Sequence, residues 1–331
     1  MPAVQEIIGR SVLDPEAFRR DVCLPCQPVV LRGLVADWPA VTAGRSPRAL
    51  RDYLLAFDNG GRMDAFVGDR SIAGKYYYGD DLKGFNFERR PMRFGDAIGA
   101  IVDGLEDKTV YAGSVPADDF LPGFSAQNPM PFAPPGSGRI WLGNESNVSS
   151  HYDTLDNLAC VIAGCRRFTL YAPGLIAKLY VGPIDNTMAG QPVSLAASLP
   201  RDPKRFPQFE RIRNQALTAE LEPGDALYLP KLWWHQVEAT ARVNGLVNYW
   251  WDGFAAGPDA PYTAMLLAMI AISERPEAER TAWRAFFDHY VFRTGGHPLA
   301  HVPEDQHGLL GPLKTNYGKL RARVMHLLRG G

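Results

Sequence analysis

Two histidines and one aspartate in this sequence have the types and spacing of transition-metal ligands. His151 and Asp153 lie two residues apart, and His235 follows 84 residues after the first histidine. Alternate residues of a β-strand point to one face, so His151 and Asp153 can reach one metal ion while Tyr152 points away. Two histidines and one carboxylate can hold non-haem Fe(II) and leave coordination positions open. The sequence predicts an oxygenase site, if the three residues converge.

A simpler explanation exists, because a lone His-x-Asp occurs by chance in many proteins. The context favours the metal site. His151 comes at the expected start of a strand, and His235 follows a Pro-Gly-Asp turn, a strand and Pro230. Two such positions on separate strands can face each other across the mouth of a barrel. The five other histidines fall in the C-terminal helical segment or its loops, where we expect surface or capping roles.

Short apolar runs separated by glycine and proline fill the middle of the chain, from about 108 to 253. This pattern is typical of antiparallel strands in a β-barrel or sandwich. Before it, 28–33 predicts a strand, while 46–57 and 92–105 predict helices, with Ser46 capping the first helix through its side chain. The first third is therefore expected to mix α and β structure.

Helical patterns return after residue 257. The segments 262–275 and 277–293 carry more large apolar side chains than a lone helical hairpin exposes in water. They either cover the barrel or form a dimer interface. The segment 314–329 predicts a basic amphipathic helix, for which we expect a solvated face on a packed helix rather than membrane binding.

Composition sets the outer limits. A chain of 331 residues can form one large β-rich domain or two smaller ones. Its formal net charge of -1 and pI near 6.7 give no global field for nucleic acid or an anionic membrane. No signal-peptide pattern occurs, and the longest apolar run, 264–272, is too short to span a bilayer, so we expect a cytoplasmic protein. Cys23 and Cys26 form a C-x-x-C without a second ligand pair for zinc.

From about 28 to 253 the chain resembles the cupin-like JmjC oxygenases, particularly the branch with the asparaginyl hydroxylase of hypoxia-inducible factor and a tRNA wybutosine hydroxylase. The matching segments are 28–33, 84–87, 151–153 with Asn157, 205–207, 223–235 and 247–250. The resemblance implies a mainly β protein with added helices, built on a double-stranded β-helix (the jelly roll of cupins). We expect an N-terminal α/β extension at 1–107, the JmjC core at 108–256, and a helical, dimerising region at 257–331.

The resemblance also implies Fe(II) as the metal, with 2-oxoglutarate and O2 as cosubstrates. His151, Asp153 and His235 then serve as both metal ligands and catalytic residues. A cation must bind the distal carboxylate of 2-oxoglutarate, and the matching position holds Arg166, with Arg167 as the alternative if the register slips by one.

Three further residues match positions that line the cosubstrate pocket of relatives, namely Tyr111, Asn157 and Asn248. Relatives often carry a threonine three residues before the first histidine ligand, where this chain has Val148. That contact is either missing or supplied by Ser149.

The substrate groove of relatives matches Tyr77, Tyr78, Leu155 and Trp250. Tyrosines also pack readily at a barrel edge, so packing is an alternative for the first two. Leu155 stands where the asparaginyl hydroxylase has a glutamine that binds the target amide, so asparagine is not the expected acceptor.

The implied reaction is hydroxylation of a protein side chain, coupled to decarboxylation of 2-oxoglutarate to succinate. Hydroxylation of a nucleoside or small metabolite, N-demethylation and a non-redox metal-binding cupin are the alternatives. The loop 201–213 carries five basic residues that could steer an acidic peptide or RNA, or could simply be solvated.

Overall fold

The computed structural model describes residues 1–8, 14–79, 84–105, 107–184, 190–255 and 257–330. The chain forms two compact units, Met1–Asp252 and Gly253–Gly331, which we describe separately. In the described parts, no helix combines the length and the apolar character that a membrane crossing requires.

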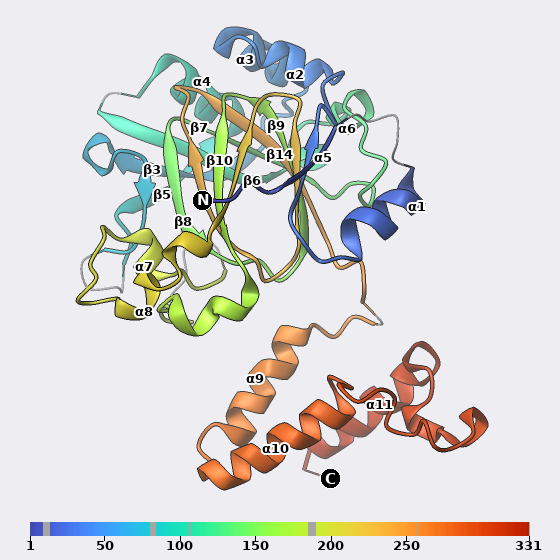
Figure 1. Ribbon diagram of the computed structural model, residues 1–331. Coiled ribbons are helices and arrows are strands. Elements are labelled where there is room, and N and C mark those ends of the chain that lie inside the picture. The colour runs from blue at the N-terminus through green and yellow to red at the C-terminus, as the bar shows by residue number, and fades with distance from the viewer. Residues whose placement is uncertain (9–13, 80–83, 106, 185–189, 256, 331) are drawn as a thin grey trace. The chain divides into compact units, whose positions relative to one another are not determined.

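Two β-sheets build the first unit (Figure 1). One sheet has the order β1 (Gln5–Ile8), β2 (Val29–Arg32), β12 (Ala226–Leu229), β9 (Asp156–Ala163), β14 (Asn244–Trp251), β7 (Gly138–Gly143), β6 (Lys108–Pro116), β3 (Arg62–Asp69) and β5 (Phe87–Arg93). The other has the order β11 (Leu217–Leu221), β10 (Arg166–Tyr171), β13 (Trp234–Ala239), β8 (Ser146–His151) and β4 (Lys75–Tyr76). Neighbours are antiparallel except for β1 with β2 and β4 with β8.

Strands from distant parts of the chain alternate within each sheet, as in the pairing of β9 with both β12 and β14. This is the jelly-roll topology, so the predicted mainly β double-stranded β-helix is confirmed. The strands β3 and β5 come from the predicted N-terminal extension, yet they continue the same sheet, because β3 pairs with β6 on one side and with β5 on the other. The extension is therefore continuous with the core through backbone hydrogen bonds.

Strand β9 contributes to two hydrophobic clusters, one on each face of the larger sheet. All eight of its residues are buried. Cys160 and Ile162 pack with the helices on one face, while Ala159 and Val161 pack between the two sheets. A strand covered on both faces has no reason to alternate apolar and polar residues, which accounts for the continuous apolar run from Leu158 to Ala163.

Short helices cover the outer face of the larger sheet in Figure 1. The helices of this unit are α1 (Pro15–Ala17), α2 (Pro39–Ala43), α3 (Pro47–Leu55), α4 (Phe94–Asp103), α5 (Ala117–Phe120), α6 (Phe124–Gln127), α7 (Leu195–Ser198) and α8 (Pro207–Glu210). The predicted helices 46–57 and 92–105 appear as α3 and α4. Two details were wrong: Ser46 makes no side-chain capping bond, and Met92 belongs to β5, where pairing with Met63 extends the strand.

The contact between α2 and β9 gives a test of the packing. Gly44 ends α2, and a Cβ atom at this position would lie 1.8 Å from the carbonyl oxygen of Ile162. We expect Gly44→Ala to lower the free energy of unfolding by about 3 kcal/mol, because the backbone on both sides must move. Chemical denaturation would measure this change.

The matched control is Gly99→Ala, in the middle of α4. A Cβ atom there meets nothing within 4 Å. Alanine is the better helix former by roughly 0.5–1 kcal/mol, so this substitution should stabilise the protein. Equal effects of the two substitutions would contradict the packing described here.

The second unit contains α9 (Pro261–Ile272), α10 (Glu277–Tyr290) and α11 (Leu313–Leu328), as predicted within a few residues. None of these helices has a buried residue. Ile270 is 83% exposed, and Trp283, Phe286 and Tyr290 of α10 are exposed on one face. The unit therefore leaves a large apolar surface uncovered.

Candidate metal centre and its cavity

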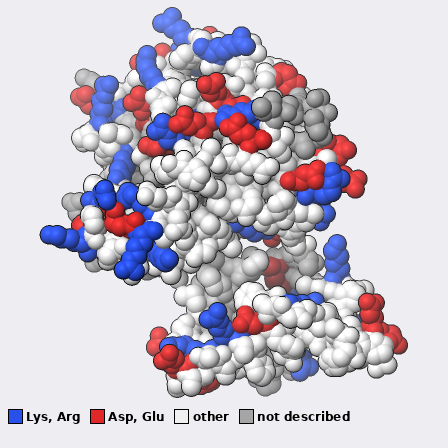
Figure 2. All heavy atoms as spheres, in the orientation of Figure 1, with Lys and Arg blue, Asp and Glu red and all other residues white. Residues whose placement is uncertain are grey.

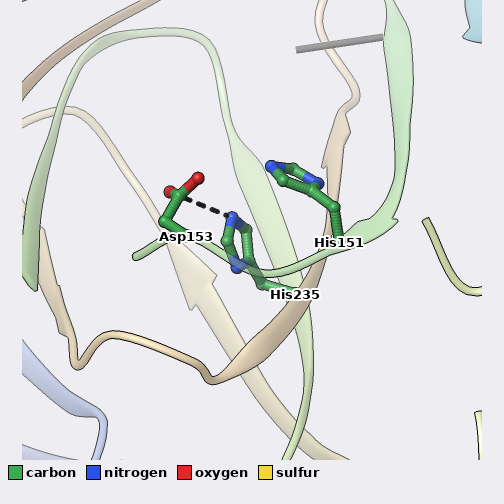
Figure 3. A group of neighbouring side chains, drawn as sticks. All are labelled: His151, Asp153 and His235. Atoms are coloured by element: carbon green, nitrogen blue, oxygen red, sulfur yellow. Dashed lines mark ion pairs between the residues drawn. The ribbon is translucent and has the colours of Figure 1, made fainter. Parts of the chain in front are cut away.

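The structure brings the two histidines and the aspartate together (Figure 3). His151 ends β8 and is paired with His235 of the antiparallel strand β13. Their ring centroids are 4.2 Å apart, and a carboxylate oxygen of Asp153 lies 3.7 Å from Nε2 of His235. One ligand atom from each residue lies within 4.8 Å of the others. Tyr152 points away and packs against Trp234, as expected.

Backbone carbonyls orient both imidazoles. Nδ1 of His151 lies 2.8 Å from the carbonyl oxygen of Ser149, and Nδ1 of His235 lies 3.0 Å from that of Trp233. When Nδ1 carries the proton and donates to the carbonyl, Nε2 presents a free lone pair. Burial, reinforced by the neighbouring His151, lowers the pKa of His235 to about 4. The ring is therefore neutral at pH 7 and fit to coordinate a metal.

The three side chains line a cavity of about 550 Å³. Its wall includes the aromatic side chains of Phe66, Tyr76, Phe87, Tyr111, Trp141, Phe168 and Trp250. The polar side chains on the wall include Asp64, Arg89, Asn157, Arg166, Gln191 and Asn248. A mostly apolar cavity with a few convergent polar groups is the usual form of a small-molecule site.

Arg166 is the buried cation of this cavity. Arg166 is only 4% exposed, and its Nε and Nη2 atoms have no hydrogen-bond partner among the described residues. Burial lowers the pKa of its guanidinium, and the neighbouring Tyr111 hydroxyl partly offsets this effect. A buried guanidinium without a carboxylate partner is costly unless an anion binds it. Arg167, the alternative, points to the other face, where it pairs with Glu220 at 2.8 Å.

The two predicted amides lie side by side on the cavity wall. Nδ2 of Asn248 donates to Oδ1 of Asn157 at 3.1 Å, and Nε1 of Trp141 donates to Oδ1 of Asn248 at 2.6 Å. Val148 also lines the cavity, whereas Ser149, the next residue of the strand, points to the other face and donates its hydroxyl to the carbonyl of Tyr76. Ser149 therefore does not replace the threonine of relatives.

The predicted substrate residues are only partly brought together. Trp250 lines the cavity and packs edge-on against Trp141. Tyr77 and Tyr78 lie outside it, in a small cluster with Val193, and Leu155 is 38% exposed on the loop after the metal ligands. The backbone leaves the short strand β4 after Tyr76, which turns the next two tyrosines away from the cavity.

Sequence reasoning missed the wall contributed by the N-terminal strands. Phe66 of β3 and Phe87 of β5 line the cavity and stack at 4.7 Å, and Tyr76 contacts Phe87 edge-on. A signal was present, because Asp64 and Phe66 are two residues apart in a strand and so share a face. Nothing local indicated that this face would meet the metal centre.

Comparison with known proteins gives one family match. The profile of the cupin-like domain family matches residues 15–257, which include the three metal-ligand candidates and the cavity. Three similar proteins show how far the likeness extends. Jumonji C domain-containing protein 5 of Drosophila melanogaster is 36% identical over 116 residues, which are 34% of this chain and 27% of that protein.

HSPB1-associated protein 1 of Bos taurus is 26% identical over 292 residues, 81% of this chain and 57% of that protein. The human bifunctional peptidase and (3S)-lysyl hydroxylase JMJD7 is 26% identical over 279 residues, 72% of this chain and 81% of that protein. The chain thus spans about a quarter of the first relative and somewhat more than half of the second.

Proposed function

Because the chain belongs to the cupin-like domain family of JmjC proteins, we propose that it is an Fe(II)- and 2-oxoglutarate-dependent oxygenase that hydroxylates a protein side chain. One observation carries the proposal: His151, Asp153 and His235 converge in the cavity that also holds the buried Arg166. A metal-binding cupin without redox chemistry has no use for a second, anionic ligand. The guanidinium of Arg166, whose Nε and Nη2 have no partner among the described residues, therefore disfavours that alternative.

Each residue has a distinct task in the proposal. The two histidines and Asp153 hold Fe(II), which with 2-oxoglutarate and O2 would supply the oxidation, releasing succinate and CO2 as one oxygen atom enters a C–H bond. Arg166 and Tyr111 receive the distal carboxylate. Asn157 and Asn248 lie where they can hold the rest of the cosubstrate.

The aromatic wall, including Trp250 and Tyr76, positions the acceptor and excludes water. A protein acceptor agrees with the names of two relatives, a lysyl hydroxylase and the lysine-specific demethylase JMJ31 of Arabidopsis thaliana. Hydroxylation of a nucleoside or small metabolite, and N-demethylation, use the same centre and are the next candidates. The relatives described above are JmjC proteins outside the asparaginyl hydroxylase branch, so membership of that branch stays a prediction.

Succinate formation tests the proposal. Protein loaded with Fe(II) without oxygen and then exposed to O2 should convert 2-oxoglutarate to succinate, whereas His235→Ala should not. Absence of both succinate and iron-dependent 2-oxoglutarate binding in the wild type would refute the oxygenase and favour the non-redox cupin. Cytoplasmic location stays a prediction.

We also propose that the helical region, predicted at 257–331, dimerises. The supporting observation is the exposed face of α10 with Trp283, Phe286 and Tyr290, since monomers rarely leave so much apolar surface uncovered. Light scattering should give the wild type twice the chain mass of 36.5 kDa. The Phe286→Glu variant should have the mass of a single chain. Arg284→Glu, on a side chain that is 84% exposed, is the control and should leave the mass unchanged. A monomeric wild type would contradict the dimer.

A further inference from the structure

A group of basic side chains follows α7 in the chain, on the segment that we call the basic loop, residues 201–213. Figure 2 shows blue side chains gathered over the region of α7 and α8. The basic loop carries Arg201, Lys204, Arg205, Arg211 and Arg213 against Asp202 and Glu210, an excess of three positive charges. The whole chain has a formal charge of -1, so this excess is local.

Internal pairing leaves part of this charge unneutralised. Glu210 is shared by Arg201 and Arg213, each with a nitrogen 2.8 Å from its carboxylate. Asp202 accepts from the backbone N–H groups of Lys204 and Arg205 and so caps the turn. Lys204, Arg205 and Arg211 are exposed, and in the described parts of the chain no acidic side chain pairs with them.

The cations sit on a packed support. The guanidinium of Arg205 lies 5.0 Å from the ring centre of Phe206, and that of Arg213 lies 4.8 Å from the ring of Phe209. Both rings are buried, and Phe206 packs on Tyr180 at 5.0 Å. Because these side chains are already ordered, binding an anion costs less conformational entropy than it would on a flexible tail.

The basic loop is tied to the metal centre through α7. The backbone N–H of Ser150, next to His151, donates to the hydroxyl of Ser198 at 3.0 Å. Arg201 follows Ser198 by three residues, so the Cα atoms of the two residues lie within roughly 11 Å of each other. The segment just before α7 contributes Gln191 and Val193 to the cavity wall. A polypeptide with one side chain in the cavity can therefore reach the basic loop with residues a few positions away.

We propose that the basic loop binds the acidic residues that flank the oxidised residue of a polypeptide substrate. Guanidinium groups pair with carboxylates bidentately, which suits acidic side chains. Single-stranded RNA is the less favoured partner, because it needs exposed aromatic rings for base stacking, and Phe206 and Phe209 are buried. This inference rests on the proposed function for its meaning, but its test does not require turnover.

Fluorescence anisotropy with three probes tests the inference. Two are labelled 15-residue peptides with the same degenerate central residue, one flanked by Asp and Glu and the other by Ser and Gly, and the third is a 15-nucleotide oligouridylate. We expect the acidic peptide to bind about 10-fold more tightly than the neutral one at low salt, and Lys204→Glu with Arg205→Glu to remove this preference. Raising the ionic strength should weaken binding of the acidic peptide and leave binding of the neutral peptide unchanged.

The matched control reverses two exposed arginines elsewhere, Arg45→Glu with Arg48→Glu at the start of α3. It changes the total charge equally and should retain the preference. Equal loss in both double variants, no preference in the wild type, or tighter binding of the oligouridylate would overturn the proposal. Succinate formation without acceptor should be the same in both double variants and in the wild type. If the wild type forms no succinate, the result counts against the oxygenase and not against the basic loop.

Discussion

Asp153→Ala is expected to abolish iron binding and succinate formation while leaving the fold intact. Loss of a residue that only orients a metal ligand already costs roughly 10–100-fold, so removal of a ligand should cost more than about 100-fold. The fold should survive for two reasons. The Asp153 side chain is 20% exposed, and its carboxylate lies next to His235, whose imidazole is neutral, so its removal breaks no ion pair. Anaerobic titration with Fe(II), succinate assays and thermal unfolding would measure the three quantities.

His151→Ala should behave in the same way. Glu220→Ala is the matched control, because it removes a carboxylate that is 67% exposed and pairs with Arg167 on the outer face. We expect unchanged iron affinity and turnover in that variant. Preserved succinate formation after loss of either His151 or Asp153 would show that the oxidation takes place elsewhere.

The metal-ligand candidates could be predicted because the decisive information was local. Spacing placed His151 and Asp153 together, and the order of a Pro-Gly-Asp turn, a strand and Pro230 before His235 pointed to a position on a separate strand. The sequence could not show that β8 and β13 are neighbours with His151 directly opposite His235. That pairing depends on which strands share a sheet, a long-range property of the whole core. The resemblance to JmjC oxygenases supplied it.

The sequence did not indicate which of the predicted substrate residues face the cavity, for a physical reason. Three consecutive tyrosines give no indication of which one faces inward until the strand partner is known. In the structure Tyr76 pairs with Val148, which itself lines the cavity, and the chain leaves the strand immediately afterwards. The choice between Arg166 and Arg167 was of the same kind. Only the register of β10 against β13 decides which guanidinium is buried.

Arg166→Met should produce opposite effects on 2-oxoglutarate binding and on stability. Truncating one partner of a buried charged pair costs roughly 2–5 kcal/mol, so the dissociation constant of 2-oxoglutarate should rise at least about 30-fold. Without 2-oxoglutarate, the wild type buries a guanidinium whose Nε and Nη2 are unpaired among the described residues. An apolar side chain of similar length removes that cost, so the ligand-free variant should be more stable by about 1 kcal/mol or more.

Without 2-oxoglutarate the Arg166→Met variant should be more stable than the wild type, and with 2-oxoglutarate the wild type should be the more stable of the two. At 100 times its dissociation constant, a ligand that binds only the folded state adds about 2.7 kcal/mol, and the variant would gain little of this. Denaturation with and without 2-oxoglutarate, in the presence of Mn(II) and without oxygen, would measure both effects. Arg167→Met should change neither by more than about 0.5 kcal/mol, because that side chain is 49% exposed. If Arg167→Met weakened 2-oxoglutarate binding and Arg166→Met did not, Arg167 would be the residue that binds the distal carboxylate. The Nε and Nη2 atoms of Arg166, unpaired among the described residues, would then need another explanation.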